Sequence, residues 1–143
     1  MDSRSNYLNF SQVYHDLLRS EEDFVNEMRH MIENYVRVFE DPSTPDAIRH
    51  LKEPLTLNLR ELYNFHANVL LKGLQYYSDD PGKVGQTFVR LERDFDLHVK
   101  YCRDEAAAIK LLDESPAKEF FDVSHILFVS LRAFFIRSLH ARR

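Results

Sequence analysis

The chain has 143 residues, 44% of them hydrophobic and 29% charged, which is a length and balance typical of one soluble domain. Three glycines and five prolines are too few for an all-β protein, and neither a GxGxxG nor a GxxxxGK[ST] phosphate loop occurs. The single cysteine, Cys102, excludes a disulfide framework, and the net charge of −4 disfavours nucleic acid as the main partner.

The charge is divided unevenly along the chain. All acidic residues lie at or before Asp122, so residues 1–122 carry a net charge of −8, whereas residues 123–143 carry +4 and no acid. This change predicts two parts, residues 1–122 and a basic, apolar tail over 123–143. The first ten residues lack the apolar stretch of a secretory signal, so we expect a cytoplasmic, reducing location.

Residues 8–40 predict one long helix, because neither glycine nor proline interrupts them and apolar side chains recur at spacings of three and four. The prolines after Glu40 end it. Thr44 before Pro45 predicts a helix cap followed by a first-turn proline, which opens a short helix over 46–52. The apolar stripe of the long helix consists of Phe10, Tyr14, Leu17, Phe24, Met28, Met31, Tyr35 and Val38.

The remainder up to Asp122 predicts helices and no strand. The expected helices cover 54–77, 84–102, 105–112 and 116–121, and the SDDPG turn follows the first of them. The stripe of the second includes Val84, Phe88, Leu91, Phe95, Val99 and Cys102. We therefore expect an all-α fold, an elongated bundle of antiparallel helices joined by short turns.

One residue breaks the apolar stripe of the first helix. Extending the stripe from Leu17 by four residues gives Glu21, and three more give Phe24. The carboxylate at this position has three interpretations. The stripe is exposed at one end, Glu21 pairs with a base, or Glu21 lies at the rim of a surface that receives a partner.

Three segments resemble the signatures of one family. VYHDLLRSEEDFVNEM (13–28) resembles the first signature region of the Dbl homology (DH) domain, the exchange module of Rho-family guanine nucleotide exchange factors. NLRELYNFHANVLLKGL (58–74) and KVGQTFVRLERDFDLHVKYCRD (83–104) resemble its next two helical segments. The resemblance runs from about Tyr7 to Asp122 and is closest to the group of Trio, kalirin and obscurin.

This resemblance implies a guanine nucleotide exchange factor that binds a Rho-family small GTPase and promotes release of GDP. Such a protein is a GTPase regulator that makes and breaks no bond, so no catalytic residue, cofactor or metal is expected. The resemblance assigns Glu21 to contact with the switch I segment of the GTPase, with Ser20, Phe24 and Val25 in support. It makes His66 a structural residue of the second signature, and the other structural positions are Phe65, Phe88, Phe95 and Tyr101.

The resemblance stops after Asp122. The family's third signature helix, of the form "yLikPvQRi.kY.lLL..ll", has no counterpart, so residues 1–122 are expected to form an incomplete, C-terminally truncated DH fold. For the non-homologous residues 123–143 three interpretations stay open: translated intron or frameshifted sequence, a basic amphipathic helix on a membrane or partner, or a helix packed loosely on the core. Membrane contact is not expected elsewhere in the chain.

Two other functions remain open besides exchange. The chain is alternatively a non-catalytic helical interaction module in a large signalling or cytoskeletal, muscle-type scaffold protein. The last alternative is an unrelated helical bundle in which the motifs are coincidental. An assay of nucleotide release discriminates between exchange and simple binding.

Overall fold

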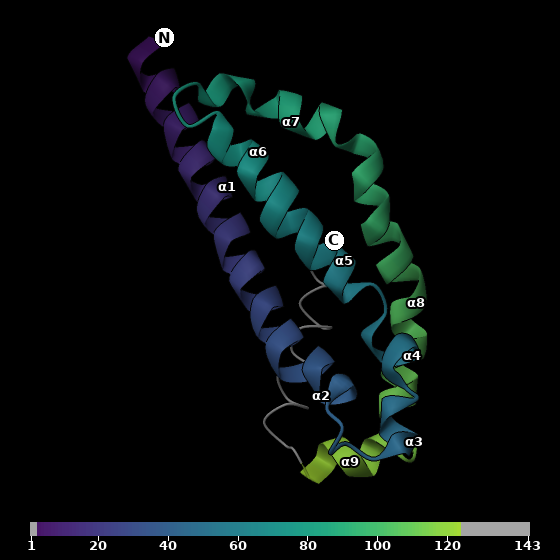
Figure 1. Ribbon diagram of the computed structural model, residues 1–143. Helices are drawn as coiled ribbons and strands as arrows, with labels where there is room; N and C mark the ends of the chain where they lie inside the picture. The colour runs from purple at the N-terminus through teal and green to yellow at the C-terminus, as the bar shows by residue number, and fades with distance from the viewer. Residues whose placement is uncertain (1–2, 124–143) are drawn as a thin grey trace. The chain divides into compact units, whose positions relative to one another are not determined.

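The computed structural model describes residues 3–123, and every regular element in that range is helical (Figure 1). The expected all-α class is therefore confirmed for this part of the chain, while the predicted tail lies outside the described residues from residue 124 onward. The chain divides into two compact units. The first comprises Met1–Met28 and Arg60–Leu97, and the second comprises Arg29–Leu59 and His98–Arg143.

The first unit is built on two antiparallel helical runs (Figure 1). Helix α1 covers Ser3–Met31, and its residues up to Met28 belong to this unit. The opposing run consists of α5 (Leu59–Phe65), the π-helical segment η2 (His66–Leu70) and α6 (Leu71–Tyr76).

The contact between these two runs is mostly apolar. Phe65, Leu70, Leu74 and Leu91 form a buried cluster, against which Leu17 and Leu18 of α1 pack. The Tyr14 hydroxyl donates a hydrogen bond of 2.7 Å to the Leu74 carbonyl. Burial, with a smaller contribution from the charge of Asp79, raises the pKa of the Tyr14 phenol above its ordinary value.

A second layer of the first unit packs on α6. It contains the 3-10 turn η3 (Pro81–Lys83), α7 (Val84–Arg90), the 3-10 turn η4 (Glu92–Phe95) and the start of α8 (Asp96–Leu112). Helices α6 and α7 approach closely at Gly73, whose carbonyl accepts a 3.3 Å hydrogen bond from the buried Thr87 hydroxyl. A glycine at this point lets the two backbones come together.

The second unit continues from the end of α1. It contains the π-helical segment η1 (Ile32–Val36), α2 (Arg37–Glu40), α3 (Asp46–Arg49), α4 (Lys52–Thr56), most of α8 and α9 (Ala117–Val123). Its core holds Tyr35, Phe39 and Phe121, whose ring centroids lie 5.2–5.9 Å apart. The Tyr35 hydroxyl donates to the Leu55 carbonyl at 3.2 Å, and burial raises the pKa of this phenol. Lys52 pairs with Glu40 at 3.3 Å on the surface.

The first helix ends at Glu40, as predicted, but it is not one regular α-helix. Helical backbone runs from Ser3 to Glu40, with the π segment η1 between α1 and α2. Asp41 then takes an extended conformation, as a residue before proline must, and the helix stops.

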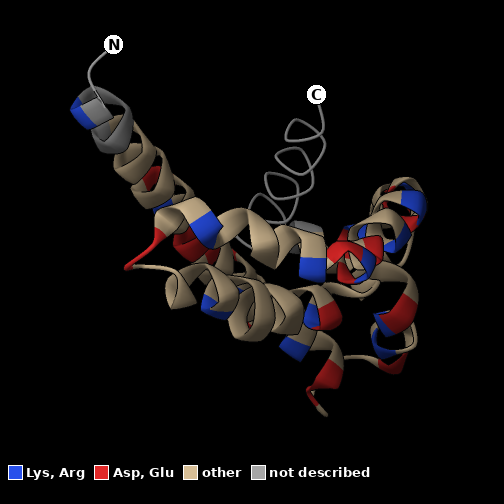
Figure 2. Ribbon diagram, turned by 90° about the horizontal axis from the view of Figure 1, so that it is seen from above, with Lys and Arg blue, Asp and Glu red and all other residues tan. Residues whose placement is uncertain are grey.

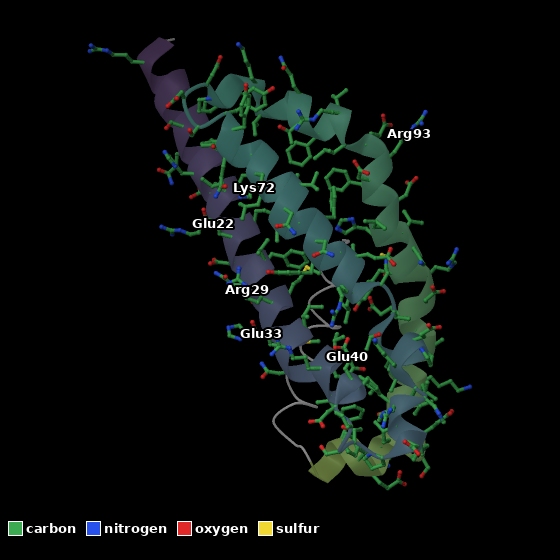
Figure 3. All side chains as sticks on the ribbon, viewed as in Figure 1. Glu22, Arg29, Glu33, Glu40, Lys72 and Arg93 are labelled. Atoms are coloured by element: carbon green, nitrogen blue, oxygen red, sulfur yellow. The ribbon has the colours of Figure 1, made fainter. Side chains whose placement is uncertain are left out.

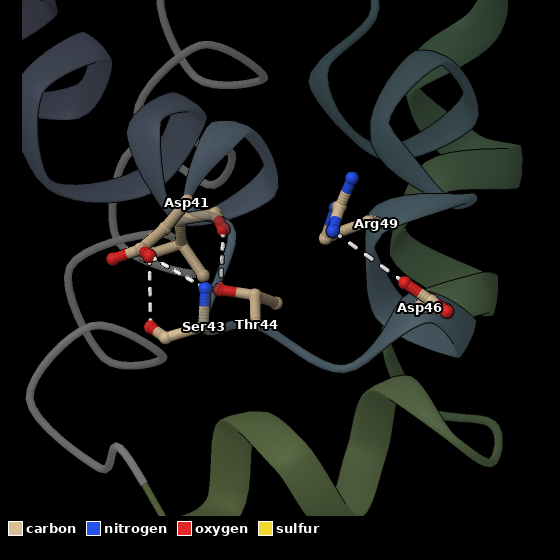
Figure 4. A network of polar contacts seen from close by, with 6 residues as sticks. Asp41, Ser43, Thr44, Asp46 and Arg49 are labelled. Carbon is tan, nitrogen blue, oxygen red and sulfur yellow. Dashed lines mark hydrogen bonds and ion pairs between the residues drawn. The ribbon is translucent and has the colours of Figure 1, made fainter.

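The predicted role of Thr44 is wrong (Figure 4). Pro45 occupies the N-cap position of α3, while the Thr44 hydroxyl turns back and donates a 2.6 Å hydrogen bond to the Val38 carbonyl. Thr44 therefore satisfies a carbonyl at the end of the preceding helix instead of capping α3.

Two other predicted helices are divided differently. The stretch 54–77 is broken at Leu57, which has a φ of 51°, and Pro54 lies within α4 rather than at a helix start. The stretch 84–102 is split by the 3-10 turn η4, and α8 runs without a break over the expected gap between 102 and 105. Neither break contains glycine, which is the usual signal.

Several residues on the predicted apolar stripes are exposed. Phe10 is 60% exposed. The opposing helix α6 contacts α1 at Tyr14 and ends at Tyr76, so α6 does not reach Phe10. Phe88 and Val99 are 36% and 65% exposed, although both lie on the predicted stripe of 84–102. Helical spacing identifies one face of a helix, but a face is buried only where a neighbouring element reaches it.

Candidate functional site

Glu21 lies on α1 with only 12% of its side chain exposed. Its carboxylate accepts a hydrogen bond from Nδ1 of His66 at 2.5 Å, and the two residues are 45 positions apart in the chain. Of the interpretations left open by the sequence, the structure therefore shows pairing with a base. The stripe is not exposed at this point, because Val25 and Met28 on the next turn of α1 are 3% and 1% exposed.

The His66 ring is enclosed by two phenylalanines of the first unit. Phe24, one turn after Glu21 on α1, meets it edge-on with a centroid distance of 4.7 Å, and Phe65 does so at 5.3 Å. The His66 side chain is 7% exposed. Since Nδ1 faces a carboxylate, which only accepts when ionised, chemistry places a hydrogen on Nδ1.

The aromatic contacts continue beyond the histidine to three other residues of the second and third motifs. Phe65 meets Phe95 edge-on at 5.2 Å, and Phe95 stacks on Phe88 at 5.9 Å with an angle of 16° between the rings. A continuous aromatic series thus links Phe24 on α1 to Phe88 on α7.

The other predicted site residues lie elsewhere. Ser20 is exposed on α1, and Val25 is buried in the core of the first unit. Tyr101 is 4% exposed in the second unit and takes no part in the aromatic series described above. The sequence identified Glu21 and His66 separately, but spacing within one helix carries no signal that would pair side chains from two helices.

The surface next to Glu21 is charged. Arg19, Glu22 and Asp23 are exposed on α1, and Lys72 is exposed on α6. Figure 3 shows Glu22 and Lys72 on the two neighbouring helical runs of the first unit. Acidic and basic residues are interspersed along the helices rather than gathered by sign (Figure 2), so a partner at this surface would meet both.

Among residues 3–123 no group of three or more His, Cys, Asp or Glu side chains is placed to hold a metal ion. Within the same residues, no helix combines the length and the hydropathy that crossing a membrane requires.

Comparison with known proteins identifies one family model and several similar proteins. The family model "RhoGEF domain" matches residues 13–138. The chain is 55% identical over 121 residues to the Muscle M-line assembly protein unc-89 of Caenorhabditis elegans, a match covering 85% of this chain and 2% of that protein. It is 28% identical over 113 residues to the human Guanine nucleotide exchange factor DBS, covering 76% of this chain and 10% of DBS. With the human Proto-oncogene DBL it shares 27% identity over 99 residues, or 66% of this chain and 11% of that protein.

The extents of these matches bear on two points. The chain spans no more than about a tenth of the length of these three relatives. The family match also extends past Asp122 to residue 138, so the boundary expected at residue 122 stays a prediction.

Proposed function

Because this chain belongs to the RhoGEF domain family, we propose that it binds a Rho-family small GTPase and accelerates release of GDP from it. Members of such a family regulate GTPases and carry out no bond chemistry of their own. The observation that carries the proposal is the mostly buried Glu21 carboxylate, which accepts a hydrogen bond from His66 at the position where the resemblance expects the family's first-signature glutamate.

The chemistry of the site is compatible with contact to a loop of a partner. One histidine N–H uses only part of the acceptor capacity of a carboxylate, which has two oxygens and about four lone-pair directions. The remaining capacity is available to backbone N–H groups or to a cation of a switch segment. Burial of most of the Glu21 side chain strengthens such a bond, because water competes less for the carboxylate.

Exchange follows from differential binding. If the chain binds the nucleotide-free GTPase more tightly than the GDP-loaded form, thermodynamic reciprocity requires that its binding weaken the hold on GDP. The side chains at the site therefore need to position a loop of the GTPase, not to transfer a proton or a phosphoryl group.

The proposal is tested by mixing the chain with Rho and Rac loaded with a fluorescent GDP. We expect release faster than the intrinsic rate, and a loss of about tenfold for Glu21→Ala, the value of one charge-assisted hydrogen bond. Glu22→Ala is the matched control, since Glu22 is the exposed neighbour on the same helix. Release at the intrinsic rate with every Rho-family GTPase tested would contradict the proposal. Equal release rates for the two variants would contradict the assignment of Glu21.

A second candidate function is a non-catalytic helical interaction module. The observation that favours it is the 55% identity to a protein named for muscle M-line assembly. This second function implies a cytoplasmic location for the chain. In that case the chain would bind a partner without changing nucleotide release. Binding of the GTPase measured by calorimetry beside the release assay separates the two functions.

A further inference from the structure

We propose that His66 is a positioning residue for GTPase engagement, which it performs by fixing the Glu21 carboxylate through Nδ1. The proposal rests on the proposed function, because the role of the pair is defined by what Glu21 contacts. It goes beyond the resemblance, which treats His66 only as a structural residue.

The first support is the geometry of the pair. The Nδ1 to carboxylate distance is 2.5 Å, and the two side chains are 7% and 12% exposed. A glutamate side chain on a helix surface ordinarily samples several rotamers, and ordering it on binding costs free energy. A hydrogen bond in a low-dielectric environment removes that freedom before the partner arrives.

The second support is the way in which the histidine itself is held. Phe24 on α1 meets the His66 ring edge-on with a centroid distance of 4.7 Å. Phe65, the residue before His66, does so at 5.3 Å. These contacts pack the ring on two sides while Nδ1 faces the Glu21 carboxylate. Groups that hold a functional side chain in this way are typical of sites that depend on preorganisation.

The third support is the backbone under the histidine. His66 begins the π-helical segment η2, and Phe65 occupies the position before it. π-helical turns are rare, are less stable than the α-helical turns they replace, and occur frequently at functional sites.

The fourth support is the chemical nature of the pair. The pair interrupts the apolar stripe of α1, on which Leu17 precedes Glu21 and Phe24 follows Glu21. Replacing a buried polar or ionic pair with apolar residues of similar size is often neutral or stabilising. Stability alone therefore does not explain why a carboxylate and an imidazole stand here.

The test compares two substitutions that place an amide N–H at different ends of the imidazole. In His66→Asn the amide lies near the position of Nδ1, whereas in His66→Gln it lies near Nε2. With the release assay at increasing concentrations of the chain, we expect the half-saturating concentration to rise about tenfold for His66→Gln and by less than about threefold for His66→Asn. Thermal unfolding of both variants reports any difference in folding.

A double variant completes the test. His66→Gln combined with Glu21→Ala should be no weaker than Glu21→Ala alone, since the histidine acts through the carboxylate. Equal half-saturating concentrations for the Asn and Gln variants, or additive losses in the double variant, would overturn the positioning role while leaving exchange intact. A wild-type chain that neither binds nor accelerates any GTPase would overturn the proposed function and this role together. If His66→Gln does not fold, the Asn variant decides alone, and a half-saturating concentration for His66→Asn that rises as far as that of Glu21→Ala would overturn the positioning role.

Discussion

At the scale of single residues, the close approach of α6 and α7 at Gly73 leaves no room for a side chain. A Cβ at Gly73 would lie 2.7 Å from Cγ2 of Thr87, on a threonine that is 1% exposed. We expect Gly73→Ala to destabilise the protein by about 1–3 kcal/mol, because the threonine or the helices must shift.

Gly85 provides the matched control for this substitution. It lies in α7, and a Cβ there would meet nothing within 4 Å. Gly85→Ala should therefore stabilise by about 0.5–1 kcal/mol through the higher helix propensity of alanine. Urea unfolding of both variants measures the difference, and equal effects of the same sign would show that the two helices are not in close contact.

Asp41 gives a pH dependence that can be predicted in sign (Figure 4). Its carboxylate accepts hydrogen bonds of 2.8 Å from both the backbone N–H and the hydroxyl of Ser43, which lower the pKa of the Asp41 side chain. A lowered pKa in the folded state contributes stability above the unfolded pKa, and that stability is lost as the pH falls through the folded pKa. We expect the free energy of unfolding to fall more steeply between about pH 5 and about pH 3 in the wild type than in Asp41→Asn. Parallel pH profiles for the two proteins would contradict this assignment.

At the scale of elements, Leu57 ends α4 in a conformation that side chains disfavour. Its φ of 51° and ψ of −133° lie in a region that glycine adopts readily and β-branched residues avoid. We expect Leu57→Val to destabilise by about 1–3 kcal/mol, while Leu57→Gly is tolerated because relief of backbone strain offsets the lost side chain. Thermal unfolding would refute the assignment of strain if the valine variant were as stable as the wild type.

The helices show how far the sequence could predict the fold. The end of the first helix at Glu40 was predictable, because Pro42 forces Asp41 into an extended conformation. The break at Leu57 was not, since it contains neither glycine nor proline and the apolar spacing continues across it. The π segments were equally hidden, because a wider turn is a compromise between backbone and packing that leaves no residue signature.

The candidate site was predictable only in its parts. The irregular carboxylate on the α1 stripe and the family motifs identified Glu21, and the second motif identified His66. Their 2.5 Å contact depends on the relative position of α1 and η2, which is set by the packing of the first unit around Phe65, Leu70 and Leu74. Such a relation between distant segments is not contained in the pattern of either one.

At the scale of the whole molecule, the proposed exchange has a reciprocal consequence. Suppose that the chain accelerates loss of GDP by favouring the nucleotide-free GTPase. Bound GDP with magnesium must then weaken the affinity of the chain for the GTPase by the same factor by which the bound chain weakens the affinity of the GTPase for GDP. Calorimetric titrations of the chain into the loaded and the empty GTPase, together with GDP titrations of the complex, measure the two factors. Equal affinity for both forms would leave simple binding as the function.

The π segment η2 also determines the helical phase of everything that follows it. A π turn accommodates one more residue than an α turn within about the same rotation, so if residues 66–70 all formed a regular α-helix, α6 would be rotated by about 100°. Leu74 would then leave the Tyr14 hydroxyl, and Gly73 would no longer face Thr87. The extra residue that aims His66 at Glu21 thus also sets the angular register by which α6 matches its neighbours on both sides.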